Sequence, residues 1–83
     1  MYVIVSYDLP LTERSKVFRI LNQRLSRVQL SVFAGPLSKQ ECAELRNDLE
    51  KLLDQGACLM WVFDRQVEPW LVGMQTDKEV NIL

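Results

Sequence analysis

Two stretches with helical periodicity, each flanked by strand-like apolar runs, limit the folds open to this chain. The first stretch, residues 13–25, repeats apolar side chains at spacings of one, three and four residues, as one face of a helix requires. Thr12 stands where an N-cap belongs. The apolar face consists of Val17, Phe18, Leu21 and Leu25.

The second helical stretch opens with a capping box at residues 38–41, in which Ser38 is the N-cap and Glu41 the N3 residue. The pattern predicts a helix that runs to about residue 54, with Gly56 as a left-handed C-terminal cap. Its apolar face consists of Cys42, Leu45, Leu49, Leu52 and Leu53.

The strand-like runs surround these helices. Residues 2–7 are rich in Val, Ile and Tyr and end at Asp8, and residues 27–37 are long enough for two short strands joined by a turn. Residues 57–63 form another apolar run. The order strand, helix, strand, strand, helix, strand predicts an α+β fold, the ferredoxin-like βαββαβ sandwich with a four-stranded antiparallel sheet and both helices on one face.

The run at residues 57–63 is apolar throughout, so we expect both of its faces to be covered. In the ferredoxin-like order 4-1-3-2 this strand lies at a sheet edge, where an unpaired apolar strand invites aggregation. The tail EVNIL, with Val80 and Ile82, is a candidate cover, exchanged between the subunits of a homodimer or folded back on its own chain. We expect one domain over residues 1–83, with a core at 1–64 and a tail at 65–83.

Composition excludes several classes of protein. The chain lacks any run of about 18 or more apolar residues, so we expect a cytoplasmic protein with no membrane association. Cys42 and Cys58 lack CxxC spacing and the chain contains no histidine, which argues against a zinc site or a Cys-His nucleophile pair. Both cysteines are expected to be reduced core residues.

The net charge of −1 hides a polarised chain: residues 1–40 carry +4 and residues 41–83 carry −5. The basic half suits phosphate, although ordinary solvated helix faces explain the same count. Within that half, Arg14 falls on the apolar stripe in the first helical turn, where the helix dipole disfavours a cation unless an anion lies nearby. Asp8 and Glu13 are the nearest acids, so Asp8 could pair with Arg14 or cap the helix and do nothing more.

Four features together resemble a known family. They are MYVIVSYDLP at the start, Arg14 and Lys16 in the first helix, RVQLSVF at 27–33, and the N-capped second helix. The chain thereby resembles the small CRISPR-associated spacer-acquisition protein, the partner of the CRISPR integrase that is often called a CRISPR-associated endoribonuclease. The resemblance covers residues 1–64. The chain differs from the family before Gly35, where it has Ala34 and the family often has an acidic residue.

The resemblance implies roles for individual residues. Asp8 and its twin across a dimer axis would hold a divalent metal such as Mg²⁺ and act in catalysis. The residues near nucleic acid would be Arg14, Lys16 and Arg27, with Ser31 and Phe33 bordering the same cleft. Considered from the residues alone, Phe33 and Trp61 suit the core better than a base-stacking surface.

Two functions follow from these expectations. One is a homodimeric scaffold that binds double-stranded DNA by its phosphates and bridges integrase subunits during spacer acquisition. The other is a magnesium-dependent endonuclease acting on RNA or DNA, including a toxin-like or stand-alone endoribonuclease. With one carboxylate per chain and no histidine base, such an active site would contain few catalytic groups. A ligand-sensing domain is a weaker third class.

Overall fold

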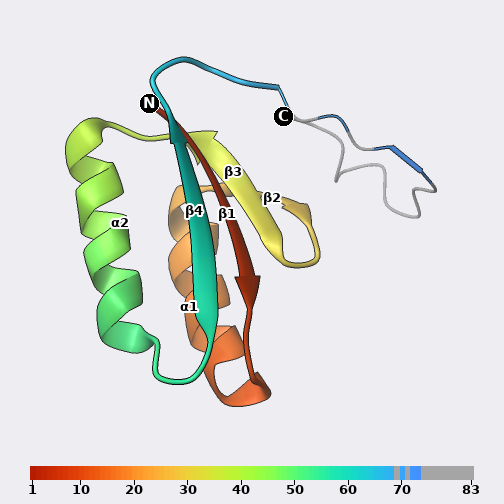
Figure 1. The fold of residues 1–83 in the computed structure, drawn as a ribbon, viewed down its shortest axis with the longest axis vertical. Helices are drawn as coiled ribbons and strands as arrows, with labels where there is room; N and C mark the ends of the chain where they lie inside the picture. Colours follow the sequence, from red (N-terminus) through yellow and green to blue (C-terminus); the bar gives the residue numbers. More distant parts are fainter. Residues whose placement is uncertain (69, 71, 74–83) are drawn as a thin grey trace.

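The computed structural model describes residues 1–68, 70, 72 and 73. Within them the chain forms β1 (Tyr2–Asp8), α1 (Leu11–Arg24), β2 (Ser26–Gln29), β3 (Val32–Pro36), α2 (Lys39–Leu52) and β4 (Ala57–Phe63), as Figure 1 shows. The predicted order of strands and helices is confirmed. The tail expected at residues 79–83, with Val80 and Ile82, lies outside the described residues.

The four strands form one antiparallel sheet in the order β2-β3-β1-β4, which is the predicted ferredoxin-like topology. Both helices pack on the same face of this sheet (Figure 1). The main core lies between the two layers, where Val5 and Phe33 from the sheet meet Leu21 of α1 and Leu45 of α2, all fully buried. A smaller cluster on the opposite face is built around Tyr2.

The start of α1 differs from the prediction. The N-cap is Pro10, and Thr12 lies inside the first helical turn, where no side chain caps the helix. The backbone amides of Glu13 and Arg14 donate to the Pro10 carbonyl at 3.0 and 3.2 Å instead. Proline fits this position because its ring fixes φ near −65°, and Pro10 has φ −66°. The chain therefore turns from β1 into α1 within two residues.

The predicted capping box of α2 is confirmed. The Ser38 side chain accepts from the Glu41 amide at 3.0 Å, and the Ser38 amide donates to the Glu41 carboxylate at 2.8 Å. The hydrogen bond from the Ser38 backbone lowers the pKa of Glu41. Gly56 is not the left-handed cap that we expected, because Gly73 is the one described glycine with positive φ. A glycine is required at position 56 because the Leu9 side chain packs against it: a Cβ there would clash with Cδ2 of Leu9.

The strand β4 is less covered than expected. Cys58 and Met60 pack against the main core, but on the other face Leu59 is 62% exposed and Trp61, expected in the core, is 46% exposed. Both exposed side chains neighbour β1, where Ile4 is the register partner of Trp61. One chain, over its described residues, therefore leaves an apolar strip on β4 open.

The structure also bears on two other expectations from composition. Within the described residues, no helix has the length and apolar character needed to cross a bilayer. Both cysteines are free: Cys42 is buried and Cys58 half-buried. Burial raises the pKa of the Cys58 thiol, which makes it a poor nucleophile.

Candidate nucleic-acid interface

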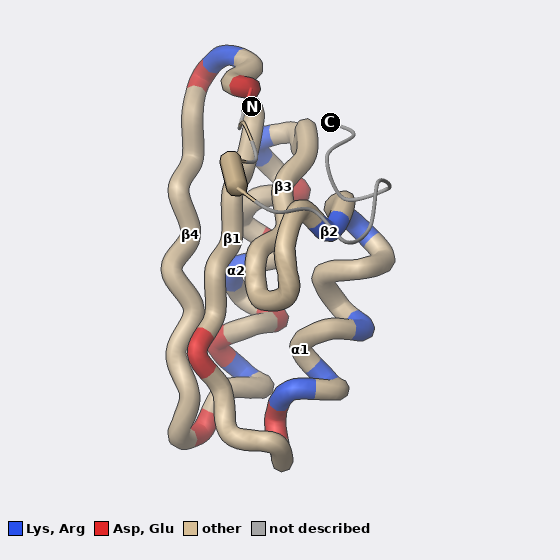
Figure 2. Tube along the Cα trace, turned by 90° about the vertical axis from the view of Figure 1, so that its right-hand side faces the viewer, with Lys and Arg blue, Asp and Glu red and all other residues tan. Residues whose placement is uncertain are grey.

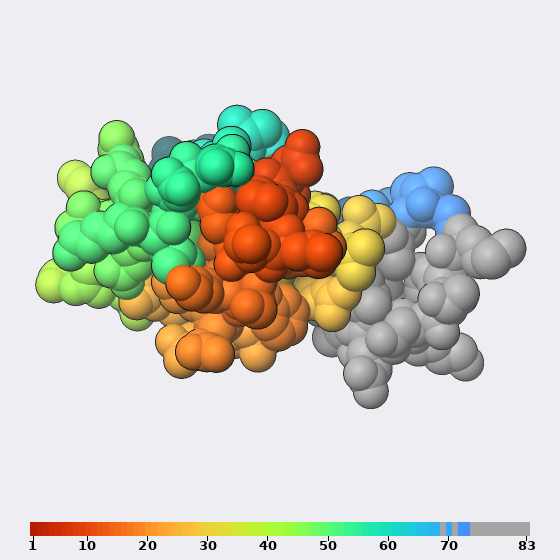
Figure 3. All heavy atoms as spheres, turned by 90° about the horizontal axis from the view of Figure 1, so that it is seen from below, coloured from red at the N-terminus to blue at the C-terminus, as the bar shows by residue number. Residues whose placement is uncertain are grey.

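An open groove of about 640 Å³ lies where the end of β1, the start of α1 and the β2–β3 turn meet. Figure 3 looks onto this end of the molecule, where the red-orange atoms that join β1 to α1 lie beside the yellow atoms of the β2–β3 turn. We call it the Asp8 groove. Four of the predicted site residues line it: Asp8, Arg14, Arg27 and Ser31. Aromatic and leucine side chains complete the lining.

Asp8 is the last residue of β1 and pairs with Ala57 of β4. Within the part of the chain that the structure describes, its exposed carboxylate takes part in no hydrogen bond or ion pair. The alternative that Asp8 caps α1 or pairs with Arg14 is therefore wrong, since α1 has no side-chain cap. The carboxylate is left available in the groove.

Arg14 reaches the groove from α1 and is held by the backbone. Its guanidinium donates to the Leu9 carbonyl at 3.0 Å, so a carbonyl oxygen rather than the expected carboxylate stabilises this cation at the helix N-terminus. The groove-facing side of α1 consists of Leu11, Arg14, Ser15 and Phe18. Their spacing of three and four residues explains why Arg14 lies on the apolar stripe.

Arg27 and Ser31 come from the opposite wall, on the β2–β3 hairpin. Arg27 is the register partner of Phe33, which places its side chain on the helix side of the sheet. Its guanidinium carbon lies 5.7 Å from the centroid of the Phe18 ring, a cation–π contact. The turn, which the sequence left open, falls at residues 30 and 31. The Tyr7 hydroxyl holds it by donating to the Leu30 carbonyl at 3.2 Å.

Phe33 does not border the groove as the resemblance implied. Its ring is fully buried, as the residue-based argument preferred, and lies beneath the groove. It stacks on Tyr7 with centroids 6.3 Å apart and meets Phe18 edge-on at 5.6 Å. These three rings form an aromatic layer, and Arg27 lies over its Phe18 ring. The argument from the residues alone thus placed Phe33 correctly, and the resemblance did not.

Lys16 is exposed and lies outside the groove. Two residues beyond Arg14, it points about 200° further around the helix, and Arg19 is exposed on the same helix. The blue segments in Figure 2 show that basic residues recur along α1. Because the acid Glu13 is buried, the exposed surface of α1 in its first three turns carries only positive charge.

Glu13 is the site-proximal residue that the sequence analysis did not single out. It is buried, and its carboxylate accepts hydrogen bonds from the amides of Asp54, Gln55 and Gly56 at 3.0–3.2 Å. These bonds, that from Asp54 foremost, lower the pKa of Glu13. The available signal was its position four residues before Val17, on the core face of α1.

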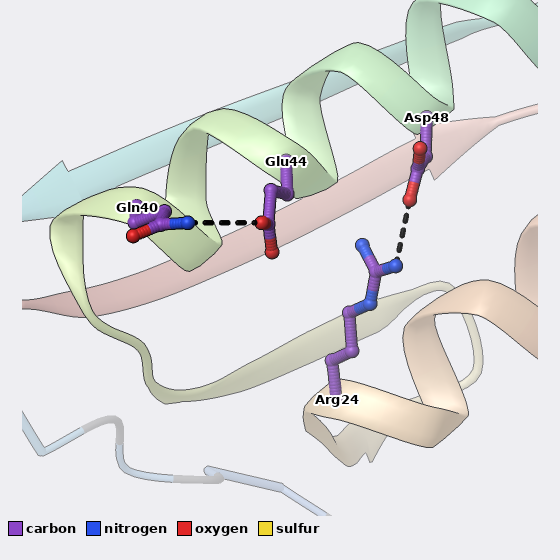
Figure 4. Close-up of polar contacts among 4 residues, drawn as sticks. All are labelled: Arg24, Gln40, Glu44 and Asp48. Carbon is purple, nitrogen blue, oxygen red and sulfur yellow. Dashed lines mark hydrogen bonds and ion pairs between the residues drawn. The ribbon is translucent and has the colours of Figure 1, made fainter.

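An ion pair links α1 to α2. Arg24 of α1 donates to the Asp48 carboxylate of α2 at 2.6 Å, and Gln40 donates to Glu44 on the same side of α2 (Figure 4). The second terminal nitrogen of Arg24 is buried and has no partner among the described residues. Arg24 is thus committed to the helix pair and is a poor candidate for nucleic acid.

The described residues of one chain do not bring a full set of metal ligands together. No group of three or more acidic, cysteine or histidine side chains comes together within the described residues. A single exposed carboxylate suits Mg²⁺ only as one of several oxygen ligands, with waters or a second chain supplying the rest. Within the described residues, Asp8 is therefore one possible oxygen ligand for such an ion and not a complete site.

The sequence and the fold both match a defined family of CRISPR-associated proteins. The family model "CRISPR associated protein Cas2" matches residues 1–68, so the chain belongs to this family. Among similar proteins, a "CRISPR-associated endoribonuclease Cas2" of Fusobacterium nucleatum is 33% identical over 92 residues, covering 100% of this chain and 87% of the relative. One from Thermodesulfovibrio yellowstonii is 35% identical and covers 99% and 98%. A solved structure titled "Crystal structure of cas2" aligns with a TM-score of 0.82 at 32% identity, over 92% of this chain and 90% of that one.

Proposed function

We propose that this chain acts in CRISPR adaptation as a homodimeric scaffold that binds double-stranded DNA through its phosphates and bridges integrase subunits. The observation that carries the proposal is the meeting of Arg14 and Arg27 on facing walls of the Asp8 groove, beside the basic surface of α1. Guanidinium groups bind phosphate in fork geometry, and such contacts are independent of base sequence. Lys16 adds a third phosphate contact from the exposed side of α1.

The dimer is supported by the open strip on β4. Leu59 and Trp61 are exposed on an edge strand, which unpaired would favour aggregation. A second copy that covers this strip would also bring in a second Asp8. A chain of 83 residues gains stability from such an interface, because a domain of this size buries only about 60 to 65% of its unfolded surface.

Replacing Leu59 with Glu is expected to convert the dimer to monomer. The side chain is 62% exposed in one chain, so the monomer tolerates the charge, whereas a covered interface does not. Sedimentation equilibrium measures the change. Asn47→Glu, which adds the same charge on the exposed surface of α2, should leave the dimer intact. A dimer that persists in Leu59→Glu would show that this strip is not the contact.

Duplex binding should become less dependent on salt when the proposed phosphate-binding side chains are removed. For Arg14→Ala and Arg27→Ala we expect weaker binding. The slope of log K against log salt should become shallower by about 0.9 for each phosphate that is no longer neutralised. Lys16→Ala should behave in the same way. Titration of a fluorescent DNA duplex at several salt concentrations gives these slopes.

The matched control is Lys51→Ala, which removes a cation from the last turn of α2. Its slope should equal that of the unaltered protein, because α2 belongs to the acidic half of the chain. If Arg14→Ala and Arg27→Ala also leave the slope unchanged, the DNA does not contact the Asp8 groove.

A second candidate function is a magnesium-dependent endonuclease, including a stand-alone or toxin-like endoribonuclease. It is favoured by the free carboxylate of Asp8 in the groove and by relatives that are named endoribonucleases. Two Asp8 side chains, one from each copy, would hold the metal, while Arg14 and Arg27 would neutralise the phosphate. Bound Mg²⁺ supplies a Lewis acid and a water nucleophile for phosphodiester hydrolysis.

A further inference from the structure

Phe18 has no part in the functions proposed above, although it is the aromatic side chain that α1 contributes to the Asp8 groove. It lies on the same side of α1 as Arg14, four residues further on, and is half-buried. It packs against the main core and also contacts a cation at the surface. Its contacts point to a role for its outer face.

The outer face of the ring carries Arg27. The guanidinium carbon lies 5.7 Å from the ring centroid, and the Nε–H donates to the Gln29 carbonyl at 3.4 Å. Neither contact uses the two terminal nitrogens of the guanidinium, which carry the N–H donors that bind a phosphate in fork geometry. Arg27 is therefore held by one face and one edge, and its binding edge is left open.

The inner side of the ring is fixed. Phe18 meets the buried Phe33 ring edge-on, at 5.6 Å and 71°, and Phe33 in turn stacks on Tyr7 at 6.3 Å. Since protein interiors are close-packed, a ring held in this way cannot turn aside without disturbing the core. An exposed arginine without such support samples many rotamers and loses that freedom when it binds.

We propose that Phe18 is a positioning residue: its ring, fixed by Phe33, orients the Arg27 guanidinium in the Asp8 groove before a nucleic-acid phosphate arrives. The inference rests on the proposed function, because it assigns Arg27 to phosphate binding. It adds a residue that touches no nucleic acid and acts through another side chain. The groove would thus bind phosphate with an arginine that is already ordered.

The test compares Phe18→Leu with Phe18→Tyr in binding to a fluorescent DNA duplex. Leu keeps the apolar packing but removes the π face, so binding should weaken about two- to fivefold, the range of an exposed cation–π contact. The slope of log K against log salt should change by no more than it does in Arg27→Ala, because the Phe18 ring acts through Arg27. Tyr keeps the π face and should restore the affinity. In the Arg27→Ala background, Phe18→Leu should have no further effect.

The outcomes separate this inference from the proposed function. If Arg27→Ala weakens binding but Phe18→Leu does not, the positioning role is wrong and the DNA scaffold stands. If Arg27→Ala changes nothing, the phosphate contact and the positioning role both fall. A salt slope that changes more in Phe18→Leu than in Arg27→Ala would mean that other basic side chains also lose phosphate, which contradicts a role through Arg27 alone.

A second measurement does not depend on the folding of a variant. In the unaltered protein, the side-chain protons of Arg27 should show the upfield NMR shift that a ring beneath them produces. Resonances at ordinary positions would overturn the cation–π contact, and with it the positioning role.

Discussion

Replacing Asp8 with Asn is expected to abolish metal-dependent cleavage of RNA and DNA while leaving duplex binding equal or slightly tighter. The amide keeps the shape of the side chain but removes the charge that a divalent cation needs. Among the described residues, no group of three or more acidic, cysteine or histidine side chains comes together to offer a ready alternative site. Binding survives because the removed charge repels phosphate, and the fold survives because the carboxylate makes no hydrogen bond or ion pair with the described residues.

The measurement is cleavage of labelled single-stranded RNA and of a DNA duplex, with Mg²⁺ and with a chelator. The matched control is Asp64→Asn, which changes an acid whose side chain is 92% exposed just after β4. Cleavage that persists in Asp8→Asn would place the activity at another site or in a contaminant. If the unaltered protein does not cleave either substrate, the nuclease is excluded and the scaffold remains.

The order of the elements could be predicted because it depends on local periodicity. The helical spacing of Val17 and Leu21, and the capping box at Ser38, act within a few residues along the chain. The role of Gly56 was predicted wrongly because it depends on a contact with a residue far away in the sequence, which local periodicity does not reveal. Gly56 is required by the approach of Leu9, which is 47 positions away in the sequence, rather than by a backbone angle of its own.

The candidate site was also predicted in part. Resemblance singled out Asp8, Arg14, Arg27 and Ser31, and the fold brings these four to one groove. Residues alone gave no reason for them to meet, since the hairpin and the helix start are joined only through the packing of the sheet. Phe33 shows the limit: alternation along β3 fixes it on the helix side, while only the structure shows that a second ring covers it.

The buried carboxylate of Glu13 gives the other large expected effect. The variant Glu13→Gln should lower the thermal midpoint clearly at neutral pH, because the amide replaces one of the two oxygens that accept from three backbone N–H groups with an NH2 donor. The amides of Asp54, Gln55 and Gly56 should then exchange faster with solvent. Glu50→Gln, the same change in an exposed surface ion pair, should have little effect.

The pH dependence makes the Glu13 prediction specific. The hydrogen bonds lower the pKa of Glu13 in the folded protein below its ordinary value of 4.5. Its contribution to stability is therefore complete above pH 4.5 and disappears as the pH falls through the folded pKa. The midpoints of the unaltered protein and Glu13→Gln should differ at pH 7 and converge below pH 4.5, as followed by circular dichroism. Parallel curves down to low pH would mean that the carboxylate does not hold the turn between α2 and β4 by its charge.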